Sequence, residues 1–242
     1  MSSPPMRISV VVPCFDEERR IGTSLAVLSE TLEGMGLDDW EVLVVDDASV
    51  DRTAAIVKDF AAEHQRVHLV VAAGGKGKGA AVRTGVMLAR CHAVLVVDAD
   101  LAGDLAVLPQ MCHRLATADA VIGSRLLPGA IVEPARSLGR RGAALIFRSA
   151  VRLMTPLRVS DPQCGFKLFR RDVVRTHIAQ TQTSGYAYEI ELLLRLADAG
   201  ALIEEIPVTW REGRDSKVRV VRDGVGMLAE VWSARRRAGQ AG

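Results

Sequence analysis

The sequence AVLVVDADL at 93–101 joins an apolar run to acidic side chains at its end. Short runs of Val and Leu are typical of parallel strands that are buried on both faces. Asp98 and Asp100 lie two residues apart, so in an extended chain their carboxylates point to the same side and repel each other unless a cation lies between them. The stretch therefore predicts a strand whose carboxyl end either binds a cation or continues into a solvated loop, since a DxD pair also occurs often by chance.

Similar apolar runs recur along the chain and alternate with segments of helical period. The runs that we expect to form strands are 7–15, 41–49, 67–74, 118–126 and 201–210. The expected helices are 17–34, 51–64, 77–90, 187–200 and a last one after Asp223. This alternation predicts an α/β fold with a mostly parallel central sheet flanked by helices. The sequence SDPQCGFKLF at 160–169 is predicted to be a loop.

Length and composition are those of one globular domain over 1–242. The chain is 49% hydrophobic, and it has no uncharged apolar run long enough to span a bilayer and no signal-peptide pattern. We therefore expect a soluble, cytoplasmic protein. The four cysteines contain no CxxC pair, so we expect neither disulfides nor a zinc site.

The charge is distributed unevenly between the halves 7–130 and 131–242. The first 130 residues contain 12 basic and 17 acidic residues, and the remainder contains 19 basic and 12 acidic ones. The basic half suits phosphates or an acidic membrane, whereas the low aromatic content of 4% disfavours single-stranded nucleic acid. Segment 136–158 has six arginines, no acid and many apolar residues. It fits an interfacial membrane helix and a core helix with a basic face equally well.

Polar residues follow three of the expected strands, at 13–18, 46–53 and 98–100. The carboxyl ends of parallel strands form the crevice in which ligands bind, so these groups are expected to converge there. Carboxylate oxygens in such a site suit Mg²⁺ or Mn²⁺ shared with substrate phosphates. We interpret Asp51 and Thr53 as helix-capping residues, and Asp46 or Asp47 as an acceptor for a nucleobase imide N–H.

Two further signals bear on the chemistry. The Gly-rich stretch around Lys78 lacks the P-loop order, but it leads into a helix whose backbone N–H groups and lysine could face an anion. No Ser-His-Asp or Cys-His arrangement is apparent, and the five histidines are expected to be structural or exposed. Any catalysis would therefore depend on carboxylates, arginines and a metal.

Seven motifs, taken in order, resemble those of the family-2 glycosyltransferases of GT-A fold. They are VVPCFDEE, VVDDASVDRT, GKGAAVRTG, DADL, GSRL, DPQCGFKLF and EIPVTW followed by SKVRVVRDGVGM. The resemblance covers about 7–232 and is strongest for the polyprenyl-phosphate sugar synthases, on account of DPQCGFKLF. It implies a metal-dependent, inverting transfer of a hexose from a nucleotide diphosphate sugar to a polyprenyl or dolichyl phosphate.

The same resemblance implies roles for individual residues. Donor-binding residues are Pro13, Phe15, Glu17, Asp46, Asp47, Lys78, Asp98, Ala99, Asp100 and Gln163. Asp98 and Asp100 would hold the metal, Arg125 and Lys217 would neutralise phosphates, and Arg136 and Arg140 would face the acceptor. Asp161 and Gln163 would line the sugar end.

The acceptor decides whether a base is needed. A lipid phosphate is already ionised at neutral pH, so metal and cationic side chains would carry most of the catalysis. A hydroxyl acceptor would need a base, with Asp161 as the first choice and Glu189 as the second. Asp104, which follows the DAD motif in place of the more usual residues, is expected to reach the metal or the sugar.

Other readings remain open at this point. The acceptor could be a soluble molecule or a natural product, or the chain could bind nucleotide sugars without catalysis. A nucleotidyltransferase is disfavoured because its Gly-rich loop normally follows the first strand. The motif DPQCGFK favours UDP-glucose by resemblance, with GDP-mannose as the alternative. We expect peripheral association with the inner face of the membrane, whereas the sequence leaves the oligomeric state open.

Overall fold

The computed structural model describes all residues except 1–5, 38, 73–74, 135–137, 212–219 and 239–242. Its central feature is a seven-stranded sheet, in the order β3-β2-β1-β4-β7-β5-β8. The strands are β1 (Arg7–Cys14), β2 (Asp39–Asp46), β3 (Val67–Val71), β4 (Ala93–Val97), β5 (Ala120–Ser124), β7 (Phe166–Arg170) and β8 (Ile203–Pro207). Strand β7 is antiparallel to both of its neighbours, and the other pairs are parallel. The expected mostly parallel sheet is confirmed.

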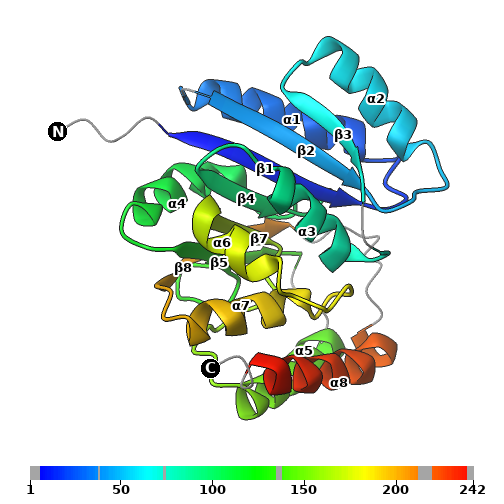
Figure 1. Ribbon diagram of the computed structural model, residues 1–242. Helices are drawn as coiled ribbons and strands as arrows, with labels where there is room; N and C mark the ends of the chain where they lie inside the picture. Colours follow the sequence, from blue (N-terminus) through cyan, green and yellow to red (C-terminus); the bar gives the residue numbers. More distant parts are fainter. Residues whose placement is uncertain (1–5, 38, 73–74, 135–137, 212–219, 239–242) are drawn as a thin grey trace.

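Helices cover both faces of this sheet (Figure 1). One face packs against α1 (Ile21–Gly34), α2 (Thr53–Glu63) and α4 (Leu108–Leu115), the last preceded by the short 3₁₀ turn η1 (Leu105–Val107). The other face packs against α3 (Lys78–Leu88), α6 (Arg171–Ile178) and α7 (Tyr188–Asp198). Helices α5 (Leu138–Met154) and α8 (Val220–Ala238) pack on each other beyond α7, as Figure 1 shows.

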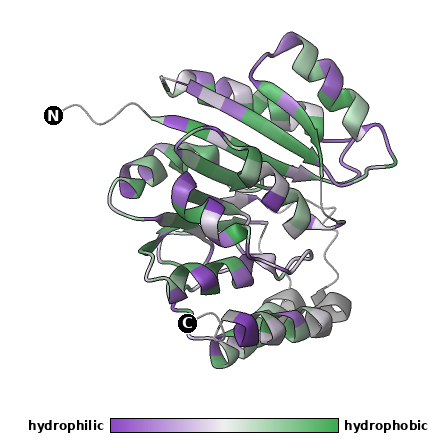
Figure 2. Cartoon of the chain, viewed as in Figure 1, coloured by the Kyte–Doolittle hydropathy of each residue, from purple (hydrophilic) through white to green (hydrophobic). Residues whose placement is uncertain are grey.

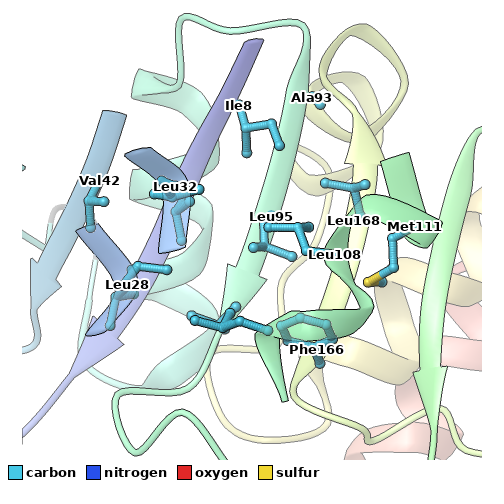
Figure 3. Close-up of a cluster of buried hydrophobic side chains, with 14 of the residues drawn as sticks. Ile8, Leu28, Leu32, Val42, Ala93, Leu95, Leu108, Met111, Phe166 and Leu168 are labelled. Carbon is cyan, nitrogen blue, oxygen red and sulfur yellow. The ribbon is translucent and has the colours of Figure 1, made fainter. Parts of the chain in front are cut away.

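The core explains why the strands read as continuous apolar runs. Strand β4 is buried at every position, because both of its faces are covered by helices. Figure 3 shows Leu95 of β4 close to Leu168 of β7, with Ile8 of β1 and with Leu108 and Met111 of α4 in the same buried cluster. The apolar colouring of the strands and the polar outer surfaces of α1 and α2 follow the same division (Figure 2).

The prediction of a loop over 160–169 is wrong for its second half. Residues 166–169 belong to β7, which lies between β4 and β5 in the middle of the sheet. Four of the five β7 residues are buried, among them Lys167. This charged side chain interrupts the apolar pattern, so the strand is hard to recognise from sequence. Because β7 comes from the second half of the chain, both halves contribute to one sheet.

A second sheet pairs β6 (Ile131–Glu133) with β9 (Thr209–Arg211) in parallel. An isolated bridge between Gly103 and Trp210 joins β9 to the loop after β4. A hydrogen bond from the Arg211 N–H to the Ala102 carbonyl, at 2.7 Å, reinforces this junction. The small sheet therefore fixes the loop that follows Asp98 and Asp100.

Other expectations can be compared directly with the structure. All four cysteines are free and buried. Within the described ranges, no helix combines the length and the apolar character that crossing a bilayer requires. Helix α5 divides its apolar residues between two environments: Val151 joins the core, whereas Leu145, Ile146 and Leu153 are exposed.

Candidate active site

A cleft of about 670 Å³ opens at the carboxyl ends of β1, β2 and β4. Its lining brings together most of the residues singled out from the sequence: Pro13, Phe15, Glu17, Asp47, Lys78, Asp98, Ala99, Asp100, Arg125, Asp161, Gln163 and Glu189. Parallel pairing of β1 with β2 and with β4 aligns the ends of the three strands, which explains this convergence. Arg136, Lys217 and the side chain of Arg140 lie outside the described residues.

Asp46 and Asp47 have different positions, although they are adjacent. The Asp46 carboxylate is buried and accepts hydrogen bonds from the Ser49 N–H at 3.3 Å and the Ser49 hydroxyl at 2.5 Å. Asp46 is absent from the residues that line the cleft, so its expected contact with the donor is not supported; it closes the turn after β2 instead. Asp47 lines the cleft and accepts from the Gly77 N–H at 2.7 Å.

Hydrogen bonds join the turn after β1 to the start of α2. The Asp51 carboxylate accepts from the Thr53 N–H at 2.8 Å and the Glu18 N–H at 3.1 Å, so it binds the first N–H of α2 although the N-cap position is Arg52. The Thr53 hydroxyl accepts from the Glu17 N–H at 2.7 Å. Glu17 itself forms an ion pair with Arg20 at 2.6 Å. These contacts hold the 15–18 turn against the start of α2.

The two acids of the DAD motif are stabilised in different ways. Lys78 Nζ lies 2.6 Å from an Asp98 oxygen and 3.6 Å from a Glu189 oxygen. Burial lowers the pKa of Lys78, but the charges of Asp98 and Glu189 outweigh this effect and raise it well above its ordinary value. Burial and the neighbouring Asp98 charge raise the pKa of Asp100. Lys78 thus neutralises Asp98, while Asp100 has the unfavourable charge that a cation would relieve.

The fit of a divalent ion can be judged from these oxygens. Asp98 and Asp100 both line the cleft and offer the hard carboxylate ligands that Mg²⁺ and Mn²⁺ prefer. Among the described residues, no group of three or more His, Cys, Asp or Glu side chains could hold a metal by itself. An ion at this position would therefore need further ligands from the substrate and water, as is usual for Mg²⁺ beside phosphates.

Arg125 is fixed by a buried bidentate ion pair with Asp161. Its Nε and Nη2 donate to the two Asp161 oxygens at 2.7 and 2.8 Å, and Nη2 also reaches the Gln163 carbonyl at 3.2 Å. The guanidinium lies over the Trp210 ring at 5.0 Å from its centroid. No acceptor for Nη1 is found among the described residues. That group can therefore serve an anion in the cleft.

Each candidate base forms an ion pair with a neighbouring cation. Burial would raise the pKa of Asp161, but the hydrogen bonds and charge of Arg125 lower it below the ordinary value. Burial acts in the same way on Glu189, and the charges of Lys167 and Lys78 lower its pKa. Lys167 Nζ lies 3.1 Å from Glu189 and donates to the Cys164 carbonyl at 2.5 Å. Both acids are counterions of buried cations.

Asp104 is another residue whose expected position differs from the observed one. Its carboxylate accepts from the Ala106 N–H at 3.0 Å and so caps η1, and it lies 4.0 Å from Arg211. It is not among the residues that line the cleft. Because the carboxylate caps η1 and Asp104 does not line the cleft, a contact with metal or sugar is not supported.

The cleft also contains residues to which the sequence assigned no role. They include Arg20, Arg148, Arg152, Tyr186 and Trp210. Arg148 and Arg152 are four residues apart on α5 and belong to the basic segment 136–158, so their spacing was a usable signal. Trp210 ends the motif EIPVTW, but its contact with Arg125 could not be inferred, because Arg125 is distant in sequence.

Comparisons with known proteins agree with this geometry. The model of the family described as glycosyl transferase family 2 matches residues 9–178. The glycosyltransferase AglD of Haloferax volcanii is 32% identical over 229 residues, which cover 93% of this chain and 36% of AglD. The dolichyl-phosphate beta-glucosyltransferase ALG5D of Trichomonas vaginalis is 31% identical, over 90% of this chain and 69% of the relative. The chain thus spans about a third of AglD.

Two further proteins complete the comparison. The undecaprenyl-phosphate mannosyltransferase of Micrococcus luteus is 31% identical over 88% of both chains. Glucosyl-3-phosphoglycerate synthase of Mycobacterium tuberculosis, solved with Mn²⁺, UDP-glucose and phosphoglyceric acid, superposes with a TM-score of 0.72 at 21% identity. The superposition covers 97% of this chain and 80% of the synthase, which establishes the shared GT-A fold. With its matching model, fold and strand-end cleft, the chain belongs to glycosyl transferase family 2.

Proposed function

We propose that the protein is an inverting glycosyltransferase that moves a hexose from a nucleotide diphosphate sugar to a polyprenyl phosphate. One observation carries the proposal: a single cleft is lined both by the Asp98–Asp100 pair and by Arg148 and Arg152 of α5. The carboxylates suit a metal-bound diphosphate, and the arginines suit a second, anionic reactant. The names of the Trichomonas and Micrococcus relatives support this acceptor class.

In this proposal, the part of the cleft built by 7–130 binds the donor. Pro13, Phe15 and Glu17 flank the nucleoside, and Asp47 accepts from the base. Phe15 lines the cleft and is 46% exposed, so its ring is accessible to a base. Asp98 and Asp100 would hold a divalent ion, which when bound stabilises the negative charge of the leaving diphosphate.

The part built by 131–242 receives the acceptor phosphate. Arg148 and Arg152 attract it, together with Arg136, Arg140 and Lys217 as suggested by the family resemblance. Arg125 Nη1 neutralises phosphate charge of the donor or of the acceptor. Because the acceptor oxygen is already ionised at neutral pH, the cleft needs no base. The ion-paired states of Asp161 and Glu189 agree with this requirement.

The nucleotide and sugar are part of the proposal. UDP-glucose is favoured because the Trichomonas relative is named a glucosyltransferase, and GDP-mannose is the alternative because the Micrococcus relative is named a mannosyltransferase. Calorimetric titration with each donor, in Mn²⁺ and in EDTA, tests this assignment. We expect metal-dependent binding of one donor. Failure of both donors to bind would refute the proposal.

Transfer itself requires a second assay with the acceptor. Purified protein is incubated with the bound donor, Mn²⁺ and a polyprenyl phosphate in detergent, and the glycolipid is identified by mass spectrometry. Phosphoglyceric acid replaces the lipid in a parallel reaction. Formation of the glycolipid supports the polyprenyl acceptor, whereas transfer only to phosphoglyceric acid would show that the acceptor is a soluble phosphate.

We also propose that α5 and α8 place the protein on the membrane that contains its acceptor. Leu145, Ile146 and Leu153 of α5 and Trp232 of α8 are exposed, with exposed fractions from 53% to 89%. Arg236 stacks over Trp232 at 4.6 Å. Apolar side chains among arginines are typical of helices that lie in an anionic bilayer interface. Flotation with phosphatidylglycerol vesicles tests this, and Ile146→Ser with Leu153→Ser is expected to abolish binding.

A further inference from the structure

The loop over 181–186 packs closely against the backbone at the start of α3. The Gly79 N–H donates to the Ser184 carbonyl at 2.7 Å. A Cβ on Gly79 would lie 2.6 Å from the Thr183 carbonyl oxygen, and one on Gly77 would overlap the Ser184 carbonyl. Only glycine therefore allows the two backbones to approach so closely. The next residues of the loop, Gly185 and Tyr186, line the cleft.

This contact determines where Lys78 lies. Lys78 stands between the two glycines that rest on the loop, and its ammonium is 2.6 Å from Asp98. The Gly77 N–H on its other side donates to Asp47 at 2.7 Å. A shift of the 181–186 loop would consequently move the groups that contact Asp47 and Asp98, both of which belong to the proposed donor site.

Glu191 of α7 accepts hydrogen bonds from the backbone of this loop. Its side chain is fully buried, and it accepts from the Thr183 N–H at 2.8 Å and the Gln182 N–H at 3.1 Å. Arg195 Nη2 lies 3.2 Å away on the same helix. Burial raises the pKa of Glu191, but hydrogen bonds from Thr183 and Gln182 and the charge of Arg237 lower it below the ordinary value. The ionised carboxylate thus fixes two consecutive backbone N–H groups of the loop.

Helix α8 reaches the same carboxylate through Arg237. Arg237 Nη2 lies 3.3 Å from Glu191 Oε2 and 3.4 Å from the Thr183 hydroxyl. Its side chain is 28% exposed, so it can be changed with little disturbance of the core. The neighbouring Arg236 has the same charge but stacks over Trp232 instead. The two arginines form a matched pair for an experiment.

We propose that Glu191 is a positioning residue for the donor site, acting through the 181–186 loop on Lys78, and that Arg237 makes this arrangement depend on α8. The inference rests on the proposed function, because it concerns binding of the nucleotide sugar. Glu191 touches neither Asp98 nor Asp100 in the interactions of the described residues; its effect passes through the backbone. Since α8 is also the proposed membrane helix, donor affinity would respond to how that helix is held.

The test measures binding of UDP-glucose and GDP-mannose with Mn²⁺ by calorimetry, without lipid. Arg237→Gln is expected to weaken binding of the donor by about threefold to tenfold, the range typical of residues that act through a packed network. Arg236→Gln should stay within about twofold of the wild type, and Arg237→Lys should recover much of the loss, because a cation again faces Glu191. Glu191→Gln should weaken binding at least as much as Arg237→Gln. The double variant should bind no more weakly than Glu191→Gln alone.

Thermal unfolding is measured for each variant, so that loss of the fold is not mistaken for loss of positioning. If Glu191→Gln does not fold, the Arg237 and Arg236 pair still decides the question. Equal donor affinity for wild type and Arg237→Gln would overturn the inference, and so would an equal loss in Arg236→Gln. Failure of the wild type to bind either donor would instead refute the proposed function itself, and the inference with it.

Discussion

Replacing Asp161 by Asn removes the charge that faces Arg125 and preserves the size of the side chain. The pair is almost inaccessible to solvent, with side-chain exposures of 15% for Arg125 and 3% for Asp161. In the wild type, both carboxylate oxygens accept from the guanidinium, and one of them also accepts from the Arg125 backbone N–H at 3.0 Å. In the variant, the amide group of Asn presents N–H donors to a guanidinium that can only donate.

The magnitude follows from the cost of an uncompensated buried charge. Removing one partner of a buried ion pair typically costs about 3–5 kcal/mol, and Asn retains one acceptor oxygen, so we expect about 3 kcal/mol. For a chain of this size, that loss corresponds to a decrease of about 6–12 °C in Tm. Arg125 would also lose its fixed orientation towards the cleft, so transferase activity should fall as well.

The pH dependence of the loss has a defined sign. The pKa of Asp161 is lower in the folded protein than its ordinary value of 3.8. The ion pair between Asp161 and Arg125 therefore stabilises the fold fully at pH values above 3.8. This stabilisation is lost as the pH falls through the lower pKa that Asp161 has in the folded protein. The Tm difference between wild type and Asp161→Asn should be full near neutral pH and shrink in acid below pH 3.8.

The assay is thermal unfolding combined with the transfer reaction. As a control, Asp161→Leu together with Arg125→Met should recover most of the lost stability, because apolar residues of similar size often replace buried ion pairs without cost. That variant should remain inactive, since it lacks the guanidinium. A general base would behave differently: Asp161→Asn would then lower activity by about 10²–10⁴ with little change in Tm. That result would refute the conclusion that Asp161 serves to orient Arg125.

Three further variants test other parts of the site, and Gly142→Ala serves as a control outside it. Asp100→Asn should abolish binding of Mn²⁺ in the presence of UDP-glucose, followed by electron paramagnetic resonance, and leave Tm unchanged or higher, because a negative charge next to Asp98 is removed. Gly165→Ala should prevent donor binding in calorimetry, because its Cβ would overlap the Asp98 carboxylate. Gly79→Ala should lower stability by about 1–3 kcal/mol through overpacking, whereas Gly142→Ala, with nothing within 4 Å, should raise it by about 0.5–1 kcal/mol in denaturant unfolding.

The parallel part of the fold was predictable because its signals are local. The apolar runs of β1, β2 and β4 and the helical periods between them depend only on neighbouring residues. Strand β7 was missed because Lys167 breaks its apolar pattern, and the partner that makes its burial possible, Glu189, lies 22 residues further along the chain. A pairing at that distance has no period from which it could be recognised.

The candidate site shows the same division between local and distant information. The convergence of 13–18, 47 and 98–100 was predictable because parallel strands align their carboxyl ends. Which of Asp46 and Asp47 faces the cleft was not, because the answer depends on the turn that Ser49 closes after β2. The ion pairs of Asp161 and Glu189 were equally hidden, so both acids were candidates for a base.

The repulsion between Asp98 and Asp100 is resolved by groups that lie far away in sequence. Lys78, at the start of α3, neutralises Asp98 and is itself held by Glu189 of α7. Because Lys78 already serves Asp98, the charge of Asp100 is the one that a bound cation would compensate, in keeping with its raised pKa. The two acids of one motif therefore have separate partners. This division makes the geometry of α3, and so of the 181–186 loop beneath it, part of the site.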